Sequence, residues 1–130
     1  MKLTDKAIAL FKGKNYAQIA TIGEDGSPQV TPVWVDTDGT NIIVNTAIGR
    51  VKERNITRDP RVAISVFDMK DPYSWVSVDG RVVKKVTGAE ADESIDSLSY
   101  KYTGNKKYQG RRAGEKRIKI IIEPTHIRAW

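Results

Sequence analysis

The chain has 130 residues, 39% of them hydrophobic, which is the length of one domain and too apolar for a disordered or fibrous protein. Cysteine is absent, which excludes disulfides and thiolate sites, and with one histidine a zinc or iron site would rest mainly on carboxylates. The 22 Lys and Arg residues outnumber the 16 Asp and Glu residues, so the net charge of +6 predicts an anionic partner.

The first half of the chain is expected to begin with a helix and to continue mainly as strands. Pro28 and Pro32 lack an N–H, so the strand that contains them is expected at a sheet edge or interrupted. Asp59-Pro60 ends the second helix, because a residue before proline disfavours the helical region. The expected elements are a helix at 4–13, strands at 16–22, 29–36 and 41–46, and a helix at 47–58.

In the second half, apolar residues alternate with polar or small ones, as in an antiparallel sheet with one buried face. A small closed barrel is the economical arrangement, because closure removes exposed sheet edges. The expected elements are a strand from Arg61, a strand at 75–82, a helix at 90–103, a polar loop at 104–114, and strands at 117–123 and 126–130 with a turn at Pro124 between them.

Some classes of protein have no support in the sequence. The start, MKLTDKAIALFKGK, lacks the apolar core of a signal peptide, and no apolar run approaches the roughly 20 residues of a membrane span. We therefore expect a cytoplasmic protein without a membrane partner. A glycine-rich phosphate loop and a Ser/His/Asp set are also missing, so any chemistry is expected to come from a bound cofactor.

The positive charge concentrates in two segments, 50–61 and 101–119. Just before the first of these segments, Asn45 and Thr46 are expected at the end of a strand. A helix that contains Arg50 and Lys52 near its start is expected to follow. The start of a helix offers free N–H groups and about half a positive charge. This arrangement indicates a phosphate or carboxylate site, and the alternative is a solvated basic helix face.

The run VNTAIGRVKERNITRDPRVAISV, with ATIGEDGSPQVTPVW before it and SWVSVDGRVV after it, resembles the pyridoxamine 5'-phosphate oxidase-like split-barrel flavoproteins. It is most similar to their short branch, which includes FMN binders and users of the deazaflavin coenzyme F420. The resemblance covers residues 5–90 well, and its most specific piece is R-x-K-x-R-N-x-x-R-D-P-R-V from Arg50 to Val62. It implies a mainly β (α+β) fold: a six-stranded antiparallel Greek-key split barrel with two or three short helices, in a single domain over residues 1–130.

The resemblance also implies a homodimer with the cofactors lodged between the subunits. Arg50 and Lys52 would hold the cofactor phosphate, while Trp75 and Ser77 would reach the site from a neighbouring strand or from the second subunit. The cofactor-binding positions carried over from the family are Gln29, Thr31, Pro32, Val33, Asn45, Thr46, Arg50, Val51, Lys52, Trp75 and Ser77.

The activity that follows is hydride transfer between FMN or coenzyme F420 and a small organic substrate. Oxidation of vitamin B6 is not expected, because the Arg-x-His substrate motif of true pyridoxamine phosphate oxidases is reversed here as His126-Ile127-Arg128. The deazaflavin is favoured over FMN, because its oligoglutamate tail needs further cations. The loop contains four such cations, Lys106, Lys107, Arg111 and Arg112. The alternative is that they belong to a solvated loop without a ligand.

Two other functions are compatible with the residues. The protein could carry or sequester a cofactor without turnover, since fold and cofactor do not settle the reaction. It could also be a small basic barrel that binds single-stranded nucleic acid, because Tyr100, Tyr102 and Tyr108 lie among lysines. Trp34, Trp75 and Trp130 could each stack on a ring, although aromatic residues in strands more often belong to the core.

Overall fold

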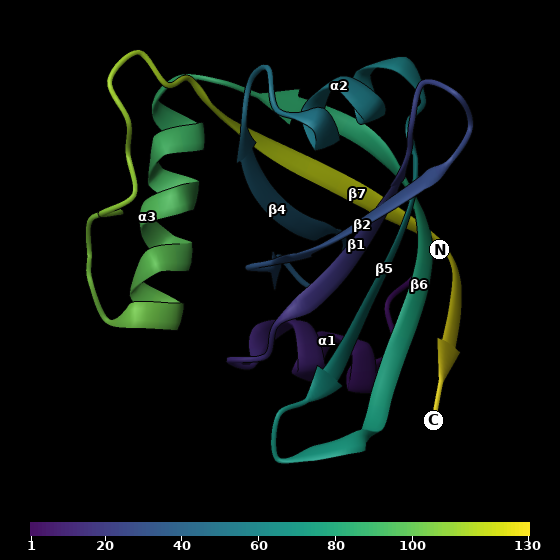
Figure 1. Cartoon of the computed structure of the whole chain (residues 1–130). Helices are drawn as coiled ribbons and strands as arrows, with labels where there is room; N and C mark the ends of the chain where they lie inside the picture. The colour runs from purple at the N-terminus through teal and green to yellow at the C-terminus, as the bar shows by residue number, and fades with distance from the viewer.

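In the computed structural model, which describes all 130 residues, seven antiparallel strands form one sheet in the order β2-β1-β5-β6-β7-β4-β3. The strands are β1 (Ala17–Ile22), β2 (Pro28–Val33), β3 (Asp36–Thr37), β4 (Ile42–Ala47), β5 (Arg61–Asp68), β6 (Asp71–Val86) and β7 (Arg117–Ala129). The helices are α1 (Asp5–Lys12), α2 (Val51–Arg58) and α3 (Ala89–Thr103). The sheet curls into a split barrel, with α1 and α2 at opposite ends and α3 along one side (Figure 1). The expected mainly β split barrel is therefore confirmed.

The split in the barrel lies where the chain passes between its two edge strands. β2 pairs with β1 at one edge of the sheet, and β3 pairs with β4 at the other edge. Only Trp34 and Val35 separate these two strands along the chain. The strand expected at 29–36 is thus two strands, and the one that contains both prolines is an edge strand, as the missing N–H groups require.

Two expectations about the strands were wrong. The sheet has seven strands and not the six that the family resemblance implies, because the short β3 pairs with β4 through Asp36 and Thr37. Pro124 does not end a strand, so the two strands expected at the C-terminal end are the single strand β7. Thr125 is the extra residue of a bulge there, since Pro124 pairs with Gly80 and His126 pairs with Asp79.

The core fills the barrel and is closed at one end by α1. Thr4 caps this helix by accepting a hydrogen bond from the N–H of Ala7 at 3.1 Å, and Phe11 is fully buried against the strands. In β4, Ile42, Val44 and Thr46 face the core while the intervening residues face outward. No helix is long and apolar enough to cross a membrane.

Candidate functional site

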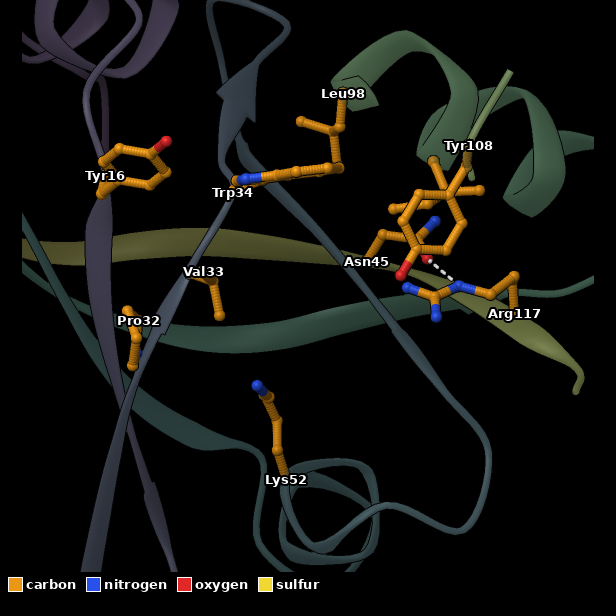
Figure 2. A pocket seen from close by; sticks show the side chains of 10 residues that line it. Tyr16, Pro32, Val33, Trp34, Asn45, Lys52, Leu98, Tyr108 and Arg117 are labelled. Carbon is orange, nitrogen blue, oxygen red and sulfur yellow. Dashed lines mark hydrogen bonds between the residues drawn. The ribbon is translucent and has the colours of Figure 1, made fainter. Parts of the chain in front are cut away.

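A cavity of about 320 Å³ lies beside the barrel, between β2, β4, α2, α3 and the start of β7. One side is aromatic and apolar, and the other side carries cations and an amide (Figure 2). Its volume is at the lower end of the range for small-molecule sites. The lining residues are Tyr16, Pro32, Val33, Trp34, Asn45, Lys52, Ile95, Leu98, Tyr108 and Arg117.

The first turn of α2 delivers one of the cations. Gly49 has a φ of +93°, which only glycine adopts readily, and its N–H donates to the Glu53 carboxylate at 2.8 Å. This bond fixes the start of the helix, so that Lys52 points into the cavity, where its Nζ donates to the Thr31 hydroxyl at 3.1 Å. Burial lowers the pKa of Lys52, and the positive charges of Arg50 and Arg117 lower it further.

The second cation of the cavity is Arg117 at the start of β7, whose side chain is only 4% exposed. Its Nε donates to Oδ1 of Asn45 at 3.0 Å, and its Nη1 donates to the Glu115 carboxylate. Asn45 is itself held by a bond from its Nδ2 to the Ala91 carbonyl at 2.9 Å. The guanidinium also lies over the ring of Tyr108, 5.1 Å from its centre.

Glu115 connects this arginine to the predicted phosphate clamp. Its second oxygen lies 3.6 Å from Nη2 of Arg50, so one carboxylate contacts a guanidinium from each side. The hydrogen bond from Arg117 and the charges of both arginines lower the pKa of Glu115. Arg50 and Arg117 therefore share a single carboxylate, and Lys52, whose pKa both arginines lower, has no carboxylate of its own. The three cations and Glu115 together carry an excess of two positive charges.

The aromatic side is built on Trp34. Its ring stacks on Tyr102 at 5.4 Å with an interplanar angle of 6°, and Tyr108 meets it edge-on at 6.0 Å. Tyr102 is fixed in turn, because its hydroxyl donates to the Asn15 carbonyl at 2.5 Å and accepts from the Val35 N–H at 3.2 Å. The indole is thus a rigid wall of the cavity.

Some of the predicted site residues are brought together in this cavity. Pro32, Val33, Asn45 and Lys52 line it, and Thr31 contacts Lys52 directly. Arg50 precedes α2 and is linked to the cavity through Glu115.

Other predicted residues lie elsewhere. Thr46 is 2% exposed and faces the core, on the opposite face of β4 from Asn45, and its hydroxyl is the one buried side-chain polar atom without a hydrogen-bond partner. Gln29 and Val51 line a separate groove beside the β1–β2 turn. Trp75 and Ser77 pair with residues of β5 and are not among the residues of the cavity.

The sequence did not assign Tyr16, Ile95, Leu98 or Arg117 to a site, and it gave Tyr108 a role only in the alternative of nucleic-acid binding. Arg117 follows Glu115 by two residues at the end of a basic loop, and this spacing was a usable signal for a paired arginine. Its contact with Asn45 depends on the pairing of β4 with β7, in which Arg117 is the register partner of Ala47 and Asn45 is that of Lys119. The two residues in contact are 72 positions apart in the sequence.

The basic loop is partly neutralised by α3. Arg111 contacts Asp92 at 3.0 Å and Asp96 at 3.1 Å, and Lys107 lies 3.5 Å from Asp96. Of the four cations expected to bind an anionic tail, two are therefore already paired, and Lys106 and Arg112 form no ion pair.

Comparison with known families gives a match over nearly the whole chain. A sequence model described as Pyridoxamine 5'-phosphate oxidase matches residues 3–130. A solved structure called F420 Reductase has a TM-score of 0.85 and 28% identity, with 97% of this chain and 98% of that chain covered. A conserved hypothetical protein from Mycobacterium tuberculosis has a TM-score of 0.77 and 29% identity, with 98% and 84% covered.

One curated relative is a 5a,11a-dehydrotetracycline/5a,11a-dehydrooxytetracycline reductase from Streptomyces rimosus. It is 35% identical over 78 residues, which cover 55% of each chain. The chain therefore spans about half the length of the curated relative that it matches.

Proposed function

The chain belongs to the pyridoxamine 5'-phosphate oxidase family, and we propose that it is an oxidoreductase that binds a flavin or deazaflavin cofactor and transfers a hydride to or from a small organic molecule. The observation that carries this proposal is the excess of positive charge at the cavity, where Arg50 and Arg117 share the single carboxylate of Glu115 and Lys52 has no carboxylate partner. A cofactor phosphate supplies the negative charge that this cluster lacks. The reductase names of two similar proteins support the general class of reaction.

The phosphate is held between Arg50, Lys52 and the free N–H groups at the start of α2. Asn45 stays fixed by its bonds to Arg117 and Ala91, so it presents a preformed polar edge to the ring. The bound cofactor supplies the hydride chemistry, and the protein binds, orients and shields it. Ile95 and Leu98, which are buried at the α3 side of the cavity, exclude water from the ring.

We propose coenzyme F420 as the cofactor, in preference to FMN. The structural similarity to an F420 Reductase over 97% of the chain supports this choice. Lys106 and Arg112 are exposed and without ion pairs, so they are available to the carboxylates of the tail. FMN, with one phosphate and no tail, would leave these two cations without a ligand.

The cofactor site is completed by a second copy of the chain, in the homodimer that we propose. Small residues form cross-strand pairs on the outer face of the sheet, Ala20 with Ala63 and Ser65 with Ser77, and all four are partly exposed. A flat face of small side chains allows a second sheet to approach closely. Trp75 would then contact the partner's cofactor, and Ala63→Arg should convert the dimer to a monomer in size-exclusion chromatography with light scattering.

The test of the proposed function is a binding titration of the purified protein with F420 and with FMN, read by visible absorbance. We expect a micromolar or lower Kd for F420, weaker binding of FMN, and cofactor oxidation or reduction in the presence of a conjugated enone. Binding of a cofactor without any turnover would support the carrier function instead. If neither cofactor binds while single-stranded nucleic acid binds with a steep salt dependence, the proposal is wrong.

A further inference from the structure

Arg117 has a donor that nothing in the protein uses. Its Nε bonds to Asn45 and its Nη1 to Glu115, while its Nη2 makes no hydrogen bond. The side chain is 4% exposed and lines the cavity, so the free N–H groups face the cavity and not bulk solvent. A guanidinium held in this way is a prepared donor for a negatively charged oxygen.

Glu115 and Asn45 hold this donor in place. They take two positions of the planar guanidinium, and Tyr108 packs against it, so its rotation is blocked. Glu115 does not line the cavity and acts through Arg117, as a positioning residue.

Trp34 provides a flat surface in the same cavity. One face of the indole is covered by Tyr102, which is not a lining residue, so the other face is turned to the cavity. Figure 2 shows the indole edge-on, with Lys52 pointing toward the cavity from the opposite side. The indole and the lysine thus bound the cavity from two sides, where stacking and positive charge would both favour a planar anionic ring.

We propose that the cavity is a receptor for a planar conjugated ring with an ionised oxygen, an enolate or phenolate, in which Trp34 stacks on the ring and Arg117 binds the oxygen. The inference rests on the proposed function for the source of the ring, which is either the cofactor or the substrate of the proposed reaction. It adds a ligand class and a specificity-determining residue that the phosphate clamp does not imply.

The probe for this receptor is 2-hydroxy-1,4-naphthoquinone, a flat bicyclic acid that is ionised at neutral pH. Its methyl ether has nearly the same shape and no charge. Equilibrium dialysis against the cofactor-free protein should show that the acid binds about tenfold more tightly than the ether, as expected for one charge-assisted hydrogen bond. Equal affinities of the acid and the ether would overturn the proposal.

The decisive variant is Glu115→Gln with Arg117→Gln, which removes both charges and so leaves no unpaired buried ion. We expect it to lose the preference for the acid while it still binds the ether, and ether binding also shows that the cavity is intact. Arg128→Gln, which removes an exposed arginine paired with Asp79, is the matched control and should keep the preference. Trp34→Leu should weaken acid and ether by the same factor. Retention of the preference in the double variant would overturn the role of Arg117.

A repeat with saturating F420 identifies the source of the ring. Displacement of the probe assigns the receptor to the cofactor ring, and simultaneous binding assigns it to a substrate; both results support the receptor. Failure of the protein to bind F420 and FMN would remove the proposed function alone, because the preference for the acid is measured on the cofactor-free protein.

Discussion

Lys52 reaches from α2 to the edge strand β2, where its Nζ lies 3.1 Å from the hydroxyl of Thr31. This bond joins two elements that border the candidate site, and it is the only hydrogen bond of the ammonium group. The lysine has no carboxylate partner, and burial together with Arg50 and Arg117 lowers its pKa. The free protein therefore holds a charge in an unfavourable environment, as expected where an anionic ligand will supply the missing partner.

The substitution Lys52→Met should separate stability from binding. It keeps the length of the side chain and removes a desolvated charge, so the cofactor-free protein should melt at an equal or higher temperature. The affinity for the cofactor should fall by about tenfold or more, because a charge-assisted contact with phosphate is lost. Thermal unfolding and an absorbance titration on the same preparation measure both effects.

Lys84→Met, on the exposed part of β6, is the control for the loss of one positive charge. It should change neither the melting temperature nor the Kd of the cofactor. An unchanged Kd in Lys52→Met would remove this lysine from the phosphate site.

The sequence predicted those features of the fold and the site that depend on neighbouring residues, and it did not predict those that depend on strand pairing between distant segments. The edge position of β2 follows from two prolines, and the position of Lys52 follows from a glycine turn and the start of a helix. Arg117 could not be placed in the same way, because its contact with Asn45 depends on strand pairing across 72 residues. The turn predicted at Pro124 was wrong because a β-bulge accommodates the missing N–H of the proline within β7. The pairing of Pro124 with Gly80 cannot be predicted from the local sequence.

Thr46→Val tests whether the hydroxyl of Thr46 has a role in the site. The hydroxyl is buried without a partner, so its replacement by a methyl group should raise the free energy of unfolding by about 1 kcal/mol. Cofactor affinity should stay within about twofold, since the side chain faces the core and not the cavity. Urea denaturation and the cofactor titration provide the two measurements.

Thr21→Val is the matched control, because Thr21 is equally buried and its hydroxyl accepts from Nδ2 of Asn55 at 3.0 Å. That substitution should lower the free energy of unfolding by about 1–3 kcal/mol, since it leaves a buried amide unpaired. A similar decrease in the free energy of unfolding of Thr46→Val, or a large loss of its cofactor affinity, would show that the Thr46 hydroxyl has a partner.

Gly80→Ala should be strongly destabilising although alanine is the smallest addition. A Cβ at this position would lie 2.6 Å from Cγ2 of Ile122 and 3.0 Å from the Glu123 carbonyl oxygen. Overpacking of this kind costs about 1–3 kcal/mol, which urea denaturation measures. Ile122→Ala removes the clashing methyl group, so the double variant should be more stable than the sum of the two single effects predicts. Strict additivity would mean that the clash is not the cause.

The stability of the protein should pass through a maximum near pH 10, because two neighbouring residues of α3 titrate in opposite senses. Burial lowers the pKa of Lys101 from 10.5 to about 8, an effect that Asp36 opposes and Lys12 reinforces. Between these values the unfolded chain binds more protons than the folded one, so stability rises with pH. Burial raises the pKa of Tyr102 from 10.0 to about 12. Between about pH 10 and 12 the folded chain binds more protons than the unfolded chain, so stability falls as the pH rises.

Urea denaturation at a series of pH values measures this profile, and single substitutions separate its two limbs. Lys101→Met should abolish the rise above pH 8, since the ammonium group that donates to the carbonyls of Phe11 and Val35 is gone. Tyr102→Phe should abolish the fall above pH 10, and it should also lower stability at all pH values through loss of the bond to Asn15. These residues pack α3 against the barrel beside Trp34, so the same pH range should alter binding in the cavity. A rising limb that persists in Lys101→Met would assign the titration to another group.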